Sequence, residues 1–497
     1  MPRVELSTDP LASSQAAMLA VAAFAGDGDD APPVPAGGAA VLGEAVGIDL
    51  AAELTTVGFR AGPGEVVRIP TRGAIPAATI VVVGLGPAGE ATTDRLRRAA
   101  AAVAGAAERV ATIATDLPSA LPDADAGDAV GAVVEGLALG SYRFGRYRAE
   151  APGHQLETAT LHVADPEASR AAVDLALVAA DAAAFARDLV NTPPQDKRPP
   201  ALAERMVEAF AGTDVQVRVL DEQALEAGGY GGILGVGRGS SEPPRLVELT
   251  YAPDGAERHV ALVGKGITFD TGGISLKPSE SMETMKMDMA GAATVAAVVR
   301  AAAELQLPVR LTGLLALAEN MPSGTATRVS DVLTMKGGTT VEVINTDAEG
   351  RLVLGDALVH ASEAEPDAIV DIATLTGAAV IALGEKVGVL MASDDDLATA
   401  LLDASKQTGE AFWRLPLATE QYGDRLEGSI ADLRNSGSRS AGTIFAGLFL
   451  HKFVGDGIPW AHLDIAGVAW AAEPDGYNAK GATGVPVRTL LRWLQAA

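Results

Sequence analysis

Short apolar runs alternate with longer helical patterns in the chain beyond Pro200, and this alternation constrains the fold more than any other sequence feature. Strands that alternate with helices favour a mostly parallel sheet with helices on both faces. The expected strands are residues 259–263, 310–317, 341–344, 368–372, 387–391 and 462–465. The expected helices include residues 290–304, 352–363, 395–407 and 442–452. This part of the chain is therefore predicted to fold as an α/β domain.

The length of 497 residues is too great for one ordinary hydrophobic core, so two or three domains are expected. A long helix is predicted to begin at Asp165 to Glu167, where an aspartate cap precedes a proline and a glutamate, and to run toward Val190. The proline-rich run from Asn191 to Pro200 then indicates a domain boundary. We predict a smaller N-terminal α/β domain (1–165), a linking helix (166–190) and a C-terminal α/β domain (191–497) with a mixed, mostly parallel sheet covered by helices.

Charge and composition disfavour several classes of protein. The formal net charge of −26 disfavours wrapping of nucleic acid or binding to an anionic membrane, because both partners would be repelled. The absence of cysteine excludes disulfides and thiolate metal sites, and it fits a reducing compartment. The first residues carry no basic end followed by an apolar run, and the apolar run Ile372 to Gly384 is too short to span a bilayer. We therefore expect a soluble, cytoplasmic protein.

The first of two charged segments extends from Gly264 to Gly291 and follows an expected strand. It contains Lys265, Asp270, Lys277 and Asp288 among glycines, where a purely structural segment would carry apolar side chains. Open α/β sheets place their ligands at the carboxyl ends of strands, which is where this segment lies. A single aspartate in a glycine-rich loop is more often a turn residue, so the combination of charges is what indicates a functional site.

The second charged segment, Asn345 to Arg351, also follows an expected strand. It carries Asp347, Glu349 and Arg351 at alternate positions, so their side chains could project together from an extended segment. Arg351 falls where a helix is expected to begin. Its guanidinium and the N–H groups of the helix N-terminus would together favour a small bound anion.

The two segments together offer four carboxylates, which two divalent ions would neutralise. None of the six histidines lies in either segment, so a carboxylate-rich site for Mn²⁺, Mg²⁺, Co²⁺ or Zn²⁺ is expected rather than a histidine-based zinc site. A lysine within bonding distance of such an ion would lose its proton and could act as a neutral ligand. The other lysine could stay cationic and face a substrate oxygen.

A glycine-rich motif near the N-terminus has two interpretations. Gly84 to Gly89 matches the GxGxxG pattern between an expected strand (78–83) and an expected helix (92–107). It could bind a dinucleotide, with Asp116 on the ribose. We favour a tight strand-to-helix turn, because a lone match is weak and Pro87 removes one N–H donor that a pyrophosphate would use.

Several sequence runs together resemble the leucyl (cytosol) aminopeptidase family. The runs are GKGITFDTGGISLKP, MKMDMAGAA, NTDAEGRL and TLTGA, with NTPP before them and WAHLDIAG and GATGVPVR after them. The resemblance extends from about Asn191 to Leu491, and the N-terminal third is similar in outline only. It implies that the C-terminal domain is a catalytic, two-metal peptidase domain.

The resemblance also implies a role for each charged residue. The metal ligands would be Lys265, Asp270, Asp288, Asp347 and Glu349, of which Asp270 and Glu349 bridge the two ions. The catalytic pair would be Lys277 and Arg351. The substrate would be bound by Met285, Asn345, Ala348, Thr374, Leu375 and Gly377, although core packing explains Met285 equally well.

The function that the resemblance implies is an aminopeptidase that releases N-terminal, leucine-like residues from peptides with a free N-terminus. A hydroxide held between two ions, Mn²⁺ or Zn²⁺ with Mg²⁺ or Co²⁺ also compatible, would attack the scissile carbonyl. Lys277 would stabilise the oxyanion, and Arg351 would hold a bicarbonate that acts as the base. The family also implies a homohexamer. The alternatives are a two-metal phosphoesterase and a DNA-binding protein, and the net charge disfavours the second.

Overall fold

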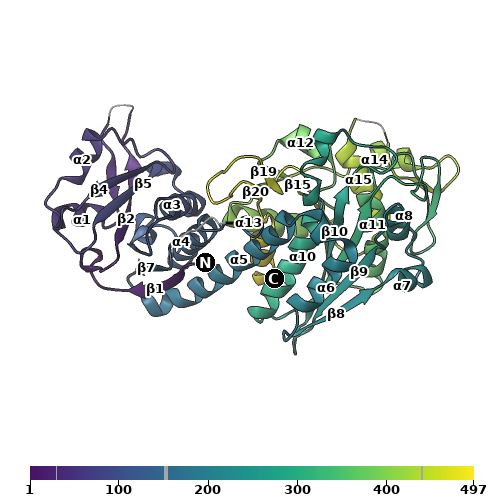
Figure 1. Cartoon of the computed structure of the whole chain (residues 1–497), viewed down its shortest axis with the longest axis horizontal. Helices are drawn as coiled ribbons and strands as arrows, with labels where there is room; N and C mark the ends of the chain where they lie inside the picture. The colour runs from purple at the N-terminus through teal and green to yellow at the C-terminus, as the bar shows by residue number, and fades with distance from the viewer. Residues whose placement is uncertain (29–30, 150–154, 438–439, 497) are drawn as a thin grey trace. The chain divides into compact units, whose positions relative to one another are not determined.

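The computed structural model describes residues 1–28, 31–149, 155–437 and 440–496 (Figure 1). The chain forms two compact units, Met1–Ala184 with Ala472–Lys480 and Phe185–Ala471 with Gly481–Ala497. The division lies inside the long helix α5 (Pro166–Asn191). Its start and end agree with the boundaries predicted from the sequence. The domain limits 1–165, 166–190 and 191–497 stay a prediction. Among the described residues, no helix is long and apolar enough to cross a membrane.

The first unit is built on a sheet with the strand order β1-β7-β6-β2-β5-β4, and β3 pairs with β2. Neighbouring strands from β1 to β5 in this order are parallel, whereas β4 and β3 are antiparallel to their neighbours. The strands are β1 (Arg3–Ser7), β2 (Met18–Ala25), β3 (Val34–Ala36), β4 (Val66–Pro70), β5 (Thr79–Pro87), β6 (Thr112–Thr115) and β7 (Thr158–His162). The helices are α1 (Ala39–Ala45), α2 (Leu50–Thr56), α3 (Thr93–Ala106), α4 (Ala126–Gly140) and the first part of α5.

The central strand β2 explains why this sheet has helices on both faces. Met18 and Ala20 pack into one hydrophobic core with α3 and α4, whereas Leu19 and Val21 pack into a second core with α1 and α2. Successive side chains of a strand point to opposite faces, so a strand that is apolar throughout is buried on both sides. Figure 1 shows the two helix pairs on opposite sides of β2.

The glycine-rich motif of the first unit spans the end of β5 and the short 3-10 turn Ala88–Glu90 before α3, so the turn interpretation holds for its second half only, and the dinucleotide interpretation stays a hypothesis. Strand β5 continues through Gly84 to Pro87, and α3 begins at Thr93 behind a Thr92 cap. A Cβ atom on Gly84 would lie 2.2 Å from the carbonyl oxygen of Gly62, so glycine is needed there for close backbone packing. The first half of the motif therefore supports the sheet.

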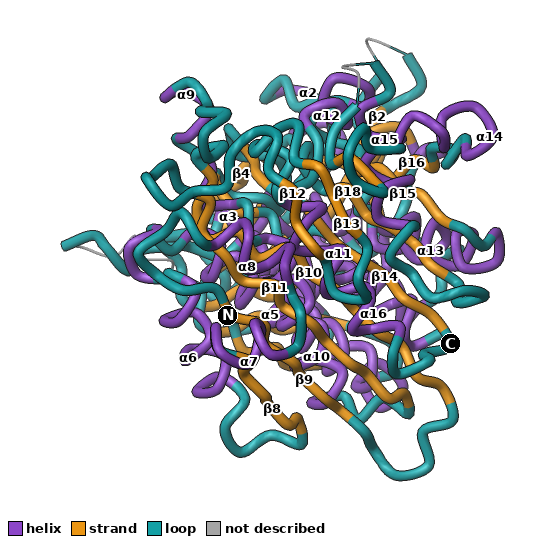
Figure 2. Tube along the Cα trace, turned by 90° about the vertical axis from the view of Figure 1, so that its right-hand side faces the viewer, coloured by secondary structure: helices purple, strands orange, loops and turns teal. Residues whose placement is uncertain are grey.

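The second unit is built on a mixed sheet with the order β16-β15-β18-β14-β10-β11-β9-β8. Its central strands β18, β14, β10 and β11 are parallel to one another. Figure 2 labels all four among the orange strands. The strands are β8 (Val215–Leu220), β9 (Arg245–Tyr251), β10 (Arg258–Asp270), β11 (Val309–Asn320), β14 (Ala368–Ala373), β15 (Gly388–Ala392), β16 (Phe412–Arg414) and β18 (Trp460–Asp464). The predicted mixed, mostly parallel sheet is confirmed.

The helices of the second unit cover both faces of this sheet. They are α6 (Pro199–Ala209), α7 (Glu222–Ala227), α8 (Gly231–Gly237), α9 (Ser279–Met282), α10 (Ala290–Glu304), α11 (Gly350–Ser362), α12 (Gly377–Leu383), α13 (Asp395–Thr408), α14 (Thr419–Tyr422), α15 (Gly442–His451) and α16 (Val487–Gln495). Smaller strands are β12 (Val332–Thr334), β13 (Thr340–Glu342), β17 (Leu433–Arg434), β19 (Trp470–Ala471) and β20 (Gly481–Ala482). The strand expected at 341–344 is shorter than predicted and belongs to a small separate sheet with β12 and β17.

Strand β10 carries the first charged segment into the space between two helices. A Cβ atom on Gly264 would lie 2.6 Å from the backbone of Ala292 in α10, so α10 packs directly on one face of β10. The next residue, Lys265, points to the opposite face, where its side chain lies against Gly350 at the start of α11. Figure 1 shows α10 and α11 on the two sides of β10.

Candidate active site

The candidate site lies where the four central parallel strands end. Asp270 is the last residue of β10, Asn320 of β11 and Asp464 of β18, and Thr374 directly follows β14. Because these strands are parallel, their carboxyl ends meet at one edge of the sheet, which is where open α/β sheets bind ligands.

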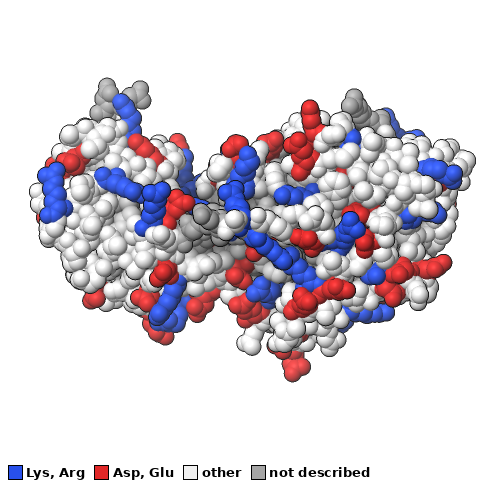
Figure 3. Space-filling view, in the orientation of Figure 1, with Lys and Arg blue, Asp and Glu red and all other residues white. Residues whose placement is uncertain are grey.

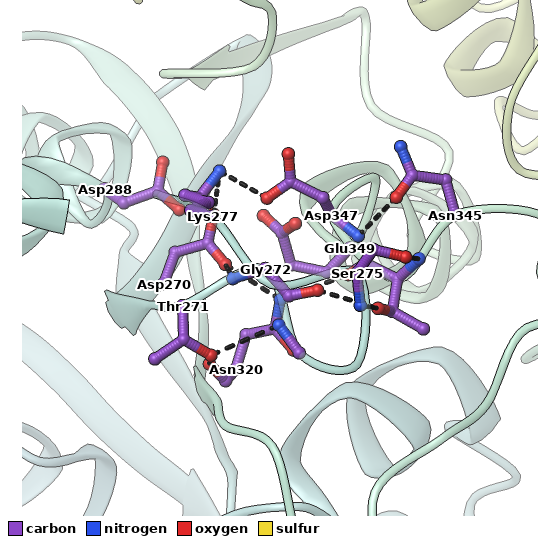
Figure 4. A network of polar contacts seen from close by, with 12 residues as sticks. Asp270, Thr271, Gly272, Ser275, Lys277, Asp288, Asn320, Asn345, Asp347 and Glu349 are labelled. Carbon is purple, nitrogen blue, oxygen red and sulfur yellow. Dashed lines mark hydrogen bonds and ion pairs between the residues drawn. The ribbon is translucent and has the colours of Figure 1, made fainter. Parts of the chain in front are cut away.

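The structure brings the two charged segments together at this edge (Figure 4). Carboxylate oxygens of Asp270, Asp347 and Glu349 all lie within 4.8 Å of one another. Asp347 lies in the turn before α11, and Glu349 is the N-cap residue of that helix. A single ion could therefore contact oxygens from both segments.

The second segment is not extended, and that part of the sequence interpretation was wrong. Glu349 has helical backbone angles, and Arg351 lies in the first turn of α11. The alternating positions therefore do not place the three side chains on one side of a strand. Asp347 and Glu349 contact the lysines of the first segment, whereas Arg351 donates from Nη1 to the carbonyl oxygen of Asn435 at 2.8 Å.

Lys265 is deeply buried among carboxylates. Its Nζ lies 2.8 Å from Asp288 Oδ1 and 2.8 Å from Glu349 Oε1, and it donates to the carbonyl oxygen of Thr374 at 3.0 Å. Burial alone would lower the pKa of this ammonium, but the carboxylates of Asp288 and Glu349 outweigh burial and raise the pKa above its usual value. Burial raises the pKa of the Asp288 carboxyl to about 8. A divalent ion among these groups would favour carboxylate over carboxylic acid and amine over ammonium.

Lys277 differs from Lys265 in its exposure. The Lys277 side chain is 17% exposed, against 4% for Lys265. Its Nζ lies 2.9 Å from Asp270 Oδ2 and also contacts Asp347 Oδ1. Burial lowers the pKa of Lys277, but the charges of Asp270 and Glu349 outweigh it and raise the pKa. Lys277 is therefore the lysine of the pair that solvent or a substrate can reach.

The carboxylates fit divalent cations. In the described part of the chain, Asp288 Oδ2 and Glu349 Oε2 are buried and have no hydrogen-bond partner. Buried charged oxygens are normally satisfied, so two unsatisfied ones in one cluster indicate a missing positive group. The four carboxylates also exceed the two nearby lysines by two negative charges. An oxygen-rich donor set of this kind suits hard or borderline divalent metals.

Arg351 offers a donor to an anion. The residue is 8% exposed, and its Nε is buried without a hydrogen-bond partner among the described residues. Burial lowers the pKa of the guanidinium to about 10, so it remains charged at neutral pH. A buried, charged donor at the start of a helix fits a small anion.

Of the predicted substrate residues, Thr374 contacts this cluster directly. Thr374 donates from Oγ1 to Asp288 Oδ1 at 2.7 Å, and the N–H of Leu375 donates to Asp464 Oδ1 at 3.1 Å. Gly377 is exposed and opens α12. Half-buried Met285 lies in a 3-10 turn, Met285–Met287, directly before Asp288. Asn345 and Ala348 lie in the turn before α11, where the N–H of Asp347 donates to Asn345 Oδ1 at 2.9 Å.

Sequence reasoning missed four residues that form hydrogen bonds within the site. Asn320 and Asp464 end their strands, and a longer expected strand 310–317 would have found Asn320 by the strand-end rule. Thr346 stands inside the NTDAEGR run and was overlooked because it carries no charge. Asn435 accepts from the N–H of Ile344 at 2.8 Å, and it belongs to no motif that could have identified it.

Comparison with known proteins explains this combination of fold and site. A model of the cytosol aminopeptidase family, catalytic domain, matches residues 184–491, and a model of the N-terminal domain of the same family matches residues 20–151. The chain belongs to the cytosol aminopeptidase family. The family predicted from the sequence is thereby confirmed.

Similar proteins of this family span nearly the whole chain. The probable cytosol aminopeptidase of Streptomyces avermitilis is 48% identical over 510 residues, which cover 99% of this chain and 98% of that protein. The solved structure of the bottromycin maturation enzyme BotP in complex with Mn is 43% identical, with a TM-score of 0.85 over 97% of this chain and 99% of that chain. A mutant of tomato leucine aminopeptidase is 30% identical, with a TM-score of 0.89 over 100% and 97% of the two chains.

Family membership settles the class of the enzyme. The chain is a cytosol aminopeptidase-family hydrolase, a metal-dependent aminopeptidase that acts on peptides. The α/β fold with an N-terminal domain and a catalytic domain agrees with the solved structures of this family.

Proposed function

We propose that this cytosol aminopeptidase uses two divalent ions to release leucine-like residues from the N-termini of peptides. The observation that carries the proposal is the meeting of Asp270, Asp347 and Glu349 oxygens within 4.8 Å, beside buried carboxylate oxygens that have no partner in the described residues. Four carboxylates would balance the charge of two such ions.

The proposed metal ligands would be shared between the two ions as follows. Lys265 and Asp288 would hold one ion, Asp347 the other, and Asp270 and Glu349 would contact both. When bound, Mn²⁺ or Zn²⁺ supplies an activated water and a positive charge that polarises the scissile carbonyl. Mg²⁺ and Co²⁺ suit the same donors. Thr374 and Asn320 would fix the carboxylates, because they donate to Asp288 and Asp270 at 2.7 and 2.8 Å.

Lys277 would stabilise the negative charge that develops on the substrate. It is the more exposed of the two lysines, and the charges of Asp270 and Glu349 raise its pKa. An ammonium aimed at a developing oxyanion contributes more in the transition state than in the ground state.

Arg351 would hold a bicarbonate that takes the proton of the attacking water. The carboxylates of the cluster are needed for the ions, so none of them is left as a free base. The unpartnered Nε of Arg351, within the part of the chain that is described, supports an anion at this place.

The first side chain of the peptide would lie against Met285, Thr374, Leu375 and Gly377. Met285 and Leu375 are half-buried apolar groups, which supports a preference for leucine-like side chains. Asn345 and Ala348 lie in the same turn as Asp347. They would contact the peptide beyond its first residue.

We also propose a cytoplasmic homohexamer that binds neither membranes nor nucleic acid. Exposed apolar residues support assembly, because Ile381 is 90% and Trp413 65% exposed. The net charge of −26 opposes anionic partners, and on the face drawn in Figure 3 basic side chains are interspersed with acidic ones. A light-scattering mass near 50.4 kDa, that of a single chain, would contradict the hexamer.

A paired substrate assay tests the proposed reaction. The Mn²⁺-loaded protein is incubated with leucyl-p-nitroanilide and, in parallel, with p-nitrophenyl phosphate. We expect release of p-nitroaniline with leucine preferred over glycine or glutamate at the same position. Hydrolysis of the phosphate alone would favour the phosphoesterase alternative, and equal rates for all first residues would contradict the leucine preference.

A further inference from the structure

Thr346 joins the two charged segments through its hydroxyl group. Its Oγ1 donates to the carbonyl oxygen of Gly272 at 2.7 Å and accepts from the N–H of Ser275 at 2.8 Å. The N–H of Thr346 in turn donates to Ser275 Oγ at 3.2 Å. Thr346 is 6% exposed, so water cannot readily replace these bonds. In Figure 4, Gly272 and Ser275 lie close to the Asn345–Glu349 turn.

The loop that Thr346 contacts is the loop that ends in Lys277. The N–H of Lys277 donates to the carbonyl oxygen of Thr271 at 2.9 Å, which closes the loop on itself. Gly272 and Gly273 have φ angles of +84° and +64°, and they let the loop approach the second segment closely. A Cβ atom on Gly273 would lie 3.0 Å from Thr346 Oγ1. Lys277 is thus carried by a compact loop that rests on Thr346.

Asp270 has one support, Asn320, that lies outside the loop held by this hydroxyl. Its Oδ1 accepts from Asn320 Nδ2 and from the N–H of Gly272, both at 2.8 Å. Asn320 Nδ2 also donates to the backbone carbonyl oxygen of Thr346 at 3.1 Å, and a substitution of the side chain retains that acceptor. Loss of the Thr346 hydroxyl would therefore loosen the Lys277 loop, while Asn320 would still hold the Asp270 carboxylate.

We propose that Thr346 is a positioning residue whose hydroxyl group sets the place of the Lys277 ammonium. The inference rests on the proposed function in one respect, namely that Lys277 contacts the reacting substrate. Without the hydroxyl, the buried carbonyl oxygen of Gly272 would lose its donor and the part-buried N–H of Ser275 its acceptor, and the loop would shift to satisfy them. A shift of about 1 Å at a catalytic group is enough to cost on the order of 10²-fold in rate.

The test compares Thr346→Val with Thr346→Ser in the full chain. Valine keeps the shape and removes the hydroxyl, whereas serine keeps the hydroxyl. For the valine variant we expect kcat on leucyl-p-nitroanilide to fall by about 10- to 100-fold, with KM and bound Mn²⁺ unchanged within about twofold. For the serine variant we expect kcat within about threefold of the unsubstituted protein, because the hydrogen bonds are retained.

A second measurement is independent of activity. The rate at which an amine-reactive acetylating reagent modifies Lys277 in the metal-free protein is followed by peptide mass spectrometry. We expect about a fivefold or greater increase in Thr346→Val and no change in Thr346→Ser, because the released loop exposes the ammonium. Thr408→Val is the matched control: Thr408 is also 6% exposed, and its hydroxyl bonds Thr489 at 2.9 Å, outside the candidate site.

Three results would overturn the inference. They are an unchanged kcat in Thr346→Val, an unchanged acetylation rate of Lys277, or loss of Mn²⁺ together with activity, which would show that Thr346 supports the metal ligands instead. Failure of the proposed function gives a different pattern. The unsubstituted protein would then lack peptidase activity, but Lys277 would still be acetylated faster in Thr346→Val than in Thr346→Ser.

Discussion

Both units contain mixed sheets with parallel central strands, yet the carboxylates at their strand ends differ in whether their charge is compensated by hydrogen bonds. In the first unit, Asp116 follows β6, and its Oδ2 accepts from the N–H of Gly38 at 2.7 Å. In the second, Asp270 ends β10, within 4.8 Å of two other carboxylates, and nearby Asp288 and Glu349 each have a buried oxygen without a partner in the described chain. The sheet therefore determines where a site can form, and uncompensated buried charge shows that one has formed.

The largest expected effect comes from Glu349→Gln, which removes one charge from the cluster. We expect the protein to lose bound metal, as measured by elemental analysis, and to lose more than about 10³-fold in kcat/KM, because the water that the metal activates returns to an ordinary pKa. The control is Glu342→Gln. Glu342 is also buried but accepts from Ser429 Oγ at 2.8 Å, so metal and activity should persist. Equal loss of metal and activity in both variants would contradict the distinction between compensated and uncompensated buried carboxylates.

Lys277→Met should have the next largest effect. Removal of the ammonium should lower kcat by about 10²- to 10³-fold, as loss of an oxyanion donor does, while metal content stays the same. Lys336→Met serves as a control, since Lys336 is a largely buried lysine that pairs with Glu363 at 2.8 Å. If the Lys277 variant loses its metal, the distinction between the two lysines of the site is wrong.

A smaller effect is expected for Arg351→Ala. Turnover should slow by about 10- to 100-fold, the lower part of the range for a general base, and any stimulation of the unsubstituted enzyme by added bicarbonate should vanish. Rates are measured in bicarbonate-free buffer with and without bicarbonate. Stimulation that persists in the variant would place the anion elsewhere.

The smallest effect is expected in the first unit, from Asp116→Asn. The carboxylate accepts one short hydrogen bond, so its change to an amide should cost about 1 kcal/mol of unfolding free energy and leave kcat/KM unchanged. Thermal unfolding with and without NADH completes the test, and NADH should not shift the Tm. A shift in Tm would support the dinucleotide interpretation. It would also weaken the conclusion that the strand ends of the first unit form no ligand site.

The sequence was sufficient to predict the elements with strong local signals. The periodicity of residues 290–304 matches α10 (Ala290–Glu304), and the cap at Asp165 marks the start of α5. The meeting of the two charged segments followed from their charge excess, and the strand-end rule accounts for the first segment only, because the second follows β13 of the small separate sheet. These features depend on local pattern and on the strand-end rule.

Features set by tertiary packing could not be predicted in the same way. Strand β5 extends through Gly84 because Gly62 approaches it, and a contact between distant segments leaves no local signal. Glu349 and Arg351 diverge because α11 starts at Gly350, two residues before the helix expected at 352–363. Asn435, which holds both Arg351 and the turn at Ile344, comes from a loop with no recognisable motif.

Metal content measured together with activity tests the central claim most directly. The purified protein is analysed for bound elements, assayed with leucyl-p-nitroanilide, stripped with a chelator, and assayed again before and after addition of Mn²⁺. We predict about two divalent ions per chain, no activity after stripping, and recovery that follows the return of both ions. Full activity in protein that has been shown to be metal-free would contradict the account.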